Sequence, residues 1–156
     1  SNATTITARP GEQVIDIERV VDAPVANVYR AYSDPELLAQ WMGPHGYVME
    51  LSTFDLRRGG EWAFVHRSPE GGSYSFRGSY HDVKPLESIT QTFEFEGVPG
   101  HVSLERVSFE DLGSSTRIRV HAVYQSVEDR DGMIASGMEL GVTQGFERMD
   151  ALVAGA

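Results

Sequence analysis

Aromatic residues recur at every second position along the middle of the chain, and this spacing is typical of β-strands. The pattern is carried by Trp62, Phe64, Tyr74, Phe76, Tyr80, Phe93 and Phe95. Residues two apart on a strand point to the same face of a sheet, and the positions between these aromatics are mostly polar. We therefore expect an antiparallel sheet with one largely hydrated face and one aromatic face, which another element must cover.

Seven segments have the composition of strands. They are Val14–Val21 and residues 47–55, 61–67, 73–83, 88–96, 102–110 and 116–125. From residue 47 onward the connections between them are short and rich in Gly or polar residues, which favours antiparallel neighbours. Between the first two strands, Pro24 and Asp34 occupy positions typical of helix starts. We expect two short helices there.

The last part of the chain predicts a long helix. Ser126 followed by Asp129 forms a capping box, and apolar residues recur on one arc as far as Val153. A helix from about Val127 to Val153 would cover the aromatic face of the sheet. The predicted fold class is therefore α+β, with an antiparallel sheet and one long C-terminal helix.

Three glycines, Gly137, Gly141 and Gly145, recur at every fourth residue of this predicted helix. Each costs about 0.5–1 kcal/mol relative to Ala in a helix interior. Either they let the helix approach the sheet closely, or their missing side chains leave a cavity between helix and sheet. The two interpretations are compatible.

The composition excludes several classes of function. The net charge is −10, which makes nucleic acid a poor partner. No apolar run is long enough to cross a membrane, so no membrane partner is expected. Without Cys there is no thiolate nucleophile and no Cys-based metal site, and no two His residues have a metal-binding spacing. We expect neither a metal nor another cofactor.

The chain predicts one domain. Residues 1–13 are expected to be a flexible N-terminal arm, of which residues 1–3 resemble the remnant of a cleaved expression tag. Residues 14–156 suit a single core, and no linker divides them. No signal peptide is visible, so we expect a cytoplasmic location. The exposed sheet and helix surfaces allow a homodimer.

Several short motifs are spread over almost all of residues 14–153, and their order and spacing are typical of one protein superfamily. They are Asp22-Ala23-Pro24, Tyr32-Ser33-Asp34-Pro35, Leu38, Trp41-Met42-Gly43-Pro44, Asp55-Leu56-Arg57-Arg58-Gly59-Gly60 with Trp62 and Phe64, Phe76-Arg77-Gly78-Ser79-Tyr80, Pro85, Ser136-Gly137-Met138-Glu139, Gly141, Gly145-Phe146 and Leu152. Together they resemble the START-like (SRPBCC) superfamily. The nearest branch is the one named after the activator of the ninety-kilodalton heat-shock protein ATPase.

This resemblance implies a helix-grip fold, in which a seven-stranded antiparallel sheet wraps around the C-terminal helix and leaves a cavity between them. Many superfamily members bind hydrophobic small molecules in that cavity. Some are cyclases or dehydratases of aromatic polyketides. The chaperone activators carry a separate N-terminal domain, for which this chain has no room.

The candidate ligand-binding residues lie on the aromatic face, on the C-terminal helix and next to the second short helix. They are Trp41, Met42, Trp62, Phe64, Phe76, Tyr80, Phe93, Phe95, Tyr124, Met138, Gly141, Val142, Gly145 and Phe146. The ligand would be small and hydrophobic, either aromatic or lipid-like. The alternative is that these residues fill a solid core, since aromatic side chains bury large areas in any fold.

His66 shares a strand face with Trp62 and Phe64, so His66 and Tyr80 are the candidates for acid–base catalysis at the cavity rim. The alternative for His66 is a hydrogen-bonded sheet histidine without a catalytic role. Three functions stay open. Binding of a small hydrophobic molecule is favoured over polyketide cyclase or dehydratase chemistry and over interaction with a chaperone.

Overall fold

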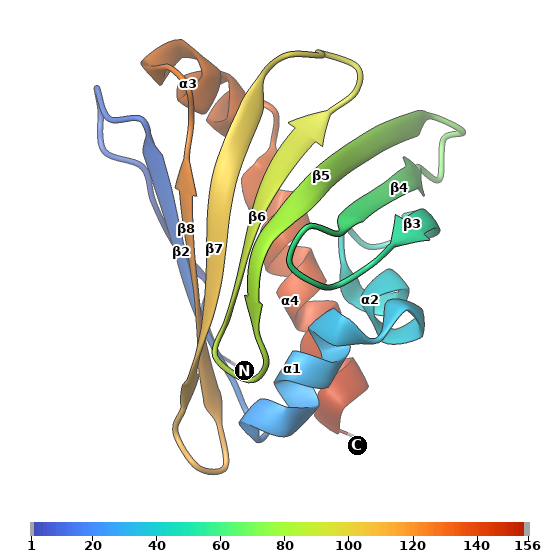
Figure 1. The fold of residues 1–156 in the computed structure, drawn as a ribbon, viewed down its shortest axis with the longest axis vertical. Helices are drawn as coiled ribbons and strands as arrows, with labels where there is room; N and C mark the ends of the chain where they lie inside the picture. The colour runs from blue at the N-terminus through green and yellow to red at the C-terminus, as the bar shows by residue number, and fades with distance from the viewer. Residues whose placement is uncertain (1, 155–156) are drawn as a thin grey trace.

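The computed structural model describes residues 2–154, which form eight strands and four helices (Figure 1). In chain order these are β1 (Thr5–Thr7), β2 (Val14–Val21), α1 (Val25–Ser33), α2 (Pro35–Trp41), β3 (Val48–Phe54), β4 (Glu61–Arg67), β5 (Ser73–Lys84), β6 (Ser88–Phe95), β7 (Val102–Asp111), β8 (Thr116–Val123), α3 (Val127–Ala135) and α4 (Met138–Ala154). The predicted α+β class is confirmed.

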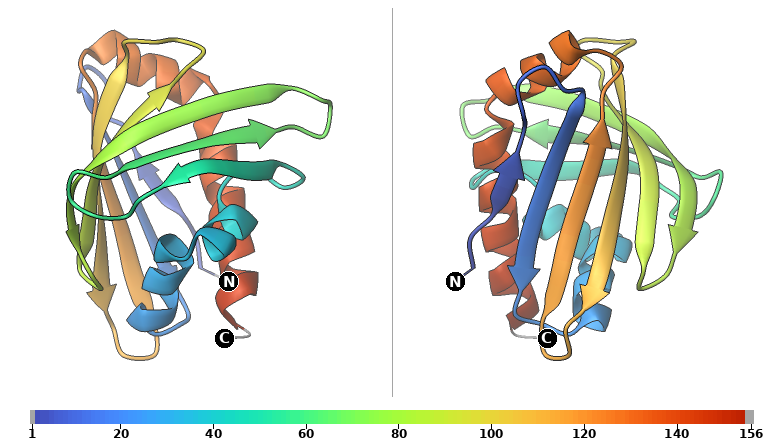
Figure 2. Two further views of the ribbon diagram at one scale, coloured as in Figure 1. Left: turned by 45° about the vertical axis from the view of Figure 1, so that its right-hand side comes forward. Right: turned by 90° about the vertical axis from the view of Figure 1, so that its left-hand side faces the viewer.

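All eight strands belong to one antiparallel sheet in the order β1-β2-β8-β7-β6-β5-β4-β3. The sheet is strongly bent, so that β3, β4 and β5 cross the direction of β2, β7 and β8 (Figure 2). The helices lie on the concave side, with α4 running along the hollow (Figure 2). This is the helix-grip arrangement that the resemblance implies.

The N-terminal arm is partly a strand, which corrects the expectation of a flexible segment over residues 1–13. Thr5 pairs with Glu18 and Thr7 with Asp16, so the sheet has eight strands instead of seven. Two β-branched threonines and an isoleucine suit a strand, and they satisfy backbone groups that β2 would otherwise leave at an edge. Farther along, Arg130 of α3 donates to the Arg9 carbonyl at 2.8 Å.

The predicted long helix is divided in two, and this is a second correction. As predicted, Ser126 caps the first part, where its hydroxyl accepts from the Asp129 N–H at 3.0 Å. The helix then ends at Ala135, and α4 begins at Met138. Gly137 between them has a φ of +84°, a left-handed conformation that glycine adopts without steric cost. The fourth-residue spacing of glycines therefore contains one helix-breaking position.

The core lies where α4 meets the sheet and α2. Phe146, Met149 and Val153 are its buried residues on α4. Trp41 of α2 stacks on Phe146 with ring planes 12° apart, and its indole N–H donates to the Ala31 carbonyl at 2.8 Å. These contacts hold α4 against the end of α2, and so they position the hollow beside it.

The two edge strands of the sheet, β1 and β3, are short or irregular. At one edge, β1 has three residues. At the other edge, the pairing of β3 with β4 contains a register shift between Leu51 and Thr53, which is a β-bulge or similar irregularity. Both edges are therefore short or interrupted.

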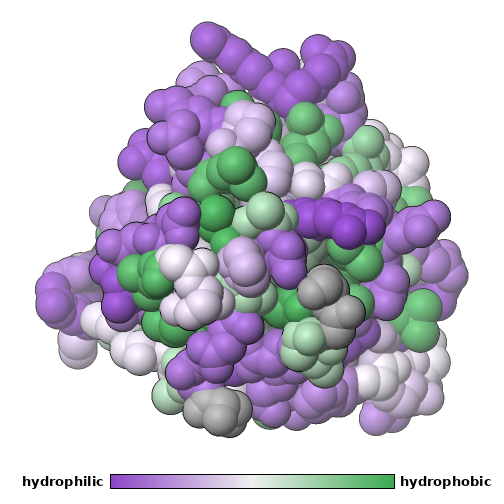
Figure 3. Space-filling model, turned by 90° about the horizontal axis from the view of Figure 1, so that it is seen from below, coloured by the Kyte–Doolittle hydropathy of each residue, from purple (hydrophilic) through white to green (hydrophobic). Residues whose placement is uncertain are grey.

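The outside of the molecule is largely hydrophilic when it is viewed from below, with hydrophobic side chains gathered in separate patches (Figure 3). Among the described residues, no helix has the length and apolar character needed to cross a membrane.

Candidate functional site

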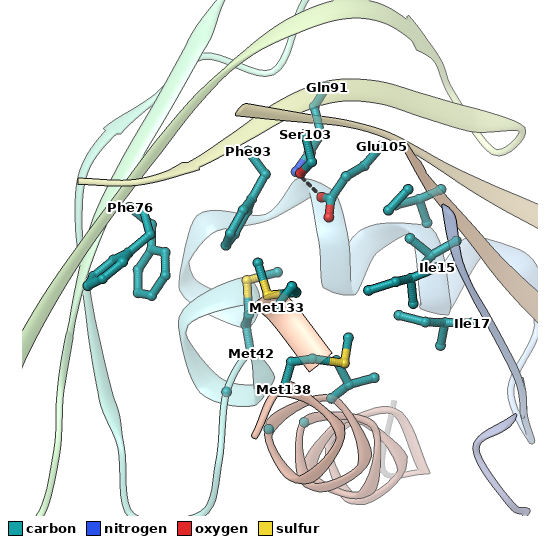
Figure 4. Close-up of a pocket in the computed structure, with 18 of the residues that line it drawn as sticks. Ile15, Ile17, Met42, Phe76, Gln91, Phe93, Ser103, Glu105, Met133 and Met138 are labelled. Atoms are coloured by element: carbon teal, nitrogen blue, oxygen red, sulfur yellow. Dashed lines mark hydrogen bonds between the residues drawn. The ribbon is translucent and has the colours of Figure 1, made fainter. Parts of the chain in front are cut away.

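A cavity of about 800 Å³ lies between the inner face of the sheet and the helices α2, α3 and α4 (Figure 4). All fourteen residues predicted to bind a ligand line it. They are Trp41, Met42, Trp62, Phe64, Phe76, Tyr80, Phe93, Phe95, Tyr124, Met138, Gly141, Val142, Gly145 and Phe146. The aromatic face of the sheet is therefore the wall of a hollow and does not fill the interior completely.

Both interpretations of the helical glycines apply to α4. Gly141 and Gly145 line the cavity. A Cβ atom at Gly145 would lie 3.3 Å from the Gly43 nitrogen and 3.3 Å from the Trp41 carbonyl oxygen, which is tight. Gly145 thus permits close approach of α4 to the chain after α2. A Cβ at Gly141 would make ordinary contacts of 3.5 Å with Pro44.

His66 is expected at the cavity rim, and the structure places it in the cavity wall, where it is buried. Its Nε2 is 3.2 Å from the Met42 carbonyl oxygen, so a neutral imidazole donates its Nε2 hydrogen there. Burial lowers the pKa of His66, which keeps the ring neutral at physiological pH. The ring also packs on Phe64, with centroids 4.7 Å apart. These contacts fit the structural alternative for His66, while its position keeps it available to a bound molecule.

The backbone beside His66 has no room for a side chain. At Gly43 a Cβ atom would lie 2.8 Å from the imidazole Cε1, and the φ is +102°. Arg148 of α4 donates to the carbonyl oxygens of Gly43 and Pro44 at 3.1 and 3.2 Å. The turn after α2 is therefore fixed between His66 and α4.

Tyr80, the second catalytic candidate, is also buried in the cavity wall. Burial raises the pKa of its hydroxyl well above the ordinary value, so the group stays protonated and serves as a hydrogen-bonding group rather than a base. Tyr80 and His66 line the same cavity, but no hydrogen bond joins them among the described residues.

Glu105 is an ionisable cavity residue that the sequence interpretation missed. It lies on β7, lines the cavity and points its carboxyl group into it beside Gln91 and Ser103 (Figure 4). Gln91 of β6 donates to the carboxylate at 3.4 Å. Burial raises the pKa of Glu105 to about 7. A carboxyl group in this state can give or accept a proton near neutral pH.

The period-two rule could have located Glu105. Val107 and Phe109 are buried, and Glu105 lies two residues before Val107 on the same strand face. The neighbouring side chains obscure the rule, because Leu104 is 49% exposed while Glu105 faces inward. Hydrophobicity alone suggests the opposite orientation for this pair.

Two tyrosines from other elements face Glu105. Tyr32 comes from α1, and Tyr124 follows β8. Burial raises the pKa of each hydroxyl above its ordinary value, and the negative charge of Glu105 raises it further. Both groups are therefore neutral whenever Glu105 is ionised, and neither compensates its charge.

One end of the cavity lies between α3 and the segment that joins β6 to β7. His101 from that segment is 2.8 Å from an Asp129 carboxylate oxygen of α3, measured at the imidazole Nδ1. His101, Glu128 and Asp129 all line the cavity, and His101 is exposed. We call these three residues the mouth cluster. Sequence patterning did not select them, because they come from a connecting segment and a helix start.

Within residues 2–154, no group of three or more His, Cys, Asp or Glu side chains is placed to hold a metal ion.

The bent antiparallel sheet, the C-terminal helix that closes it and the hollow between them define a helix-grip domain of the START-like type. Residues 22–154 match the family model described as "Activator of Hsp90 ATPase homolog 1-like protein", and the chain belongs to this family. Among curated proteins, none matches the chain.

Several solved structures share the fold. A protein from Arthrobacter aurescens, solved by solution NMR, has a TM-score of 0.88 at 23% identity, over 97% of this chain and 92% of that one. A crystal structure from Chromobacterium violaceum has a TM-score of 0.80 at 28% identity, over 90% and 96% of the two chains. The AHSA1 protein from Silicibacter pomeroyi has a TM-score of 0.75 at 24% identity, over 90% and 97%.

Proposed function

We propose that the protein binds a small hydrophobic molecule in the cavity between the sheet and α4. The observation that carries this proposal is the cavity itself. Its volume of about 800 Å³ falls within the range of about 300–1,000 Å³ that is usual for small-molecule sites. An apolar hollow of this size in a natural domain is a binding-site candidate because core packing normally leaves only small voids.

The walls suit an apolar ligand. Aromatic rings from neighbouring strands pack on one another, with Phe64 and Phe76 centroids 5.2 Å apart, and they form one side. Met42, Met133 and Met138 stand together on another side (Figure 4). Methionine side chains are flexible and polarisable, so they adapt to ligands of different shape.

The proposal is tested by thermal unfolding and native mass spectrometry with a panel of aromatic polyketides and lipids. A ligand at one hundred times its Kd stabilises the folded state by about 2.7 kcal/mol. We expect at least one member of the panel to raise the melting temperature and to appear as a one-to-one complex. A panel without any stabilising member would contradict the proposal.

Two variants on α4 make the test specific to the cavity. Val142 lines the cavity, whereas Leu140 is 61% exposed on the same helix. Val142→Trp places a large ring inside the hollow and should reduce the ligand-induced rise in melting temperature. Leu140→Trp adds the same side chain outside and should leave the rise unchanged. Equal responses of the two variants would show that the ligand binds elsewhere.

An enzymatic function of the cyclase or dehydratase kind is the second candidate, and Glu105 is the observation that favours it. A carboxyl group with a pKa near neutrality inside a cavity is a typical general acid or base. Under this function a polyketide that binds is also converted, as followed by mass spectrometry. Glu105→Gln would then retain binding and lose turnover.

A further inference from the structure

The charged side chains that line the cavity are acidic. Glu105 lies on β7, and Glu128 and Asp129 lie at the start of α3. None of the described residues that line the cavity is Lys or Arg. The bases there are His66, which is held neutral by burial, and His101, which is engaged with Asp129. The electrostatic environment of a bound molecule is therefore negative.

Within residues 2–154, no Lys or Arg side chain forms an ion pair or a hydrogen bond with Glu105. Its one side-chain hydrogen bond among the described residues is the 3.4 Å contact from Gln91, and the tyrosines that face it are neutral. Arg19 of β2 is another buried charge, and it forms an ion pair with Asp150 of α4. The fold thus supplies a counter-charge for Arg19 and none for Glu105.

An ionised carboxylate in apolar surroundings is costly unless a partner of opposite charge approaches it. A ligand can be that partner. The polar group formed by Gln91, Ser103 and Glu105 lies on β6 and β7, while methionines stand across the cavity and isoleucines of β2 stand at its side (Figure 4). This division suits a molecule with one polar end and an apolar body.

Resting on the proposed function, we infer that the cavity selects apolar molecules that carry one basic amine, whose ammonium group pairs with the Glu105 carboxylate. Such a charge-assisted hydrogen bond is stronger than a neutral one. The aromatic wall adds favourable surroundings for a cation. A fatty acid or another anionic amphiphile would place a second negative charge in the acidic cavity, and the site disfavours it.

Three probes with the same apolar chain and different ends test this inference: decylamine, decanol and decanoate. Isothermal titration calorimetry at about pH 8, where Glu105 is ionised, measures each Kd. We expect the wild-type protein to bind decylamine at least about tenfold more tightly than decanoate. In Glu105→Gln, which keeps the shape of the side chain, this preference should fall to within about threefold. Binding of decanol should be unchanged.

A matched control separates the site from the overall charge of −10. Glu18→Gln removes the same unit of charge at an exposed position that pairs with Arg119, and it should keep the preference for decylamine. Equal binding of decylamine and decanoate by the wild-type protein would overturn the inference, and so would an unchanged preference in Glu105→Gln. Failure of all three probes to bind would contradict the inference, and the panel of aromatic polyketides and lipids decides the proposed function separately. Binding of decanol without the amine preference contradicts the inference alone.

Discussion

Acidic residues on the two faces of the sheet differ in whether a basic side chain pairs with them. On the outer face, Glu18 pairs with Arg119 at 2.8 Å and Glu94 pairs with Arg77 at 3.1 Å. On the inner face, Glu105 meets an amide and no cation. These two outer charges are compensated by arginines of the same chain, whereas Glu105 forms no ion pair among the described residues. This difference is the basis of the proposed role of Glu105 in ligand binding.

The largest expected effect comes from breaking the ion pair of a buried arginine. Asp150→Ala leaves the buried Arg19 without its carboxylate partner. We expect a loss of about 3 kcal/mol in the free energy of unfolding, at the low end for buried pairs because Asp150 is 29% exposed. Urea unfolding followed by circular dichroism measures it. A loss below about 1 kcal/mol would mean that the pair behaves like a surface pair.

A smaller effect with a characteristic pH dependence is expected at Glu105. Its folded-state pKa of about 7 lies above the ordinary value of 4.5. Between these values the folded protein holds a proton that the unfolded chain has released, so the free energy of unfolding falls as pH rises toward neutrality. The fall contributed by this group amounts to at most about 3 kcal/mol and is complete above its folded pKa.

Glu105→Gln lacks this titration, so its stability should exceed that of the wild-type protein most clearly above neutral pH. Tyr32 and Tyr124, which face Glu105, stay protonated throughout because burial raises the pKa of both. Urea unfolding of both proteins from about pH 5 to about pH 8 measures the difference. Parallel stability curves would show that Glu105 is compensated after all.

The smallest effect is expected on the outer face. Glu18→Gln removes one member of an exposed pair, since Glu18 and Arg119 are 48% and 55% exposed. Exposed pairs contribute about 0–1 kcal/mol, so the melting temperature should scarcely change. A large loss of stability in Glu18→Gln would mean that charges on the outer face matter as much for stability as those on the inner face.

The sequence predicted the architecture because hydrophobic periodicity acts over many residues. The aromatic alternation located the inner face, and the capping residues Asp34 and Ser126 located two helix starts. The candidate residues line one cavity because they lie on that face or on the helices that cover it. Expectations about ligand binding and the homodimer stay predictions.

The features that hydrophobic periodicity did not predict depend on single residues and on the structural elements around them. Gly137 breaks the helix because its backbone is left-handed, whereas Gly141 and Gly145 continue it. Glu105 faces inward because the register of β7 is set by Val107 and Phe109, against the local preference of Leu104 for burial. At Leu104 the register of the strand outweighs the residue's own tendency toward burial.

The interrupted edges of the sheet have a consequence for how copies of this chain behave in a crowded solution. An exposed, regular edge strand offers unpaired backbone groups to another molecule and invites aggregation. Here the three-residue β1 occupies one edge, and the irregular β3 occupies the other. Neither edge presents a long, regular row of backbone groups. A protein whose interior holds a large apolar hollow is thereby protected from the strand-to-strand association that its sheet would otherwise favour.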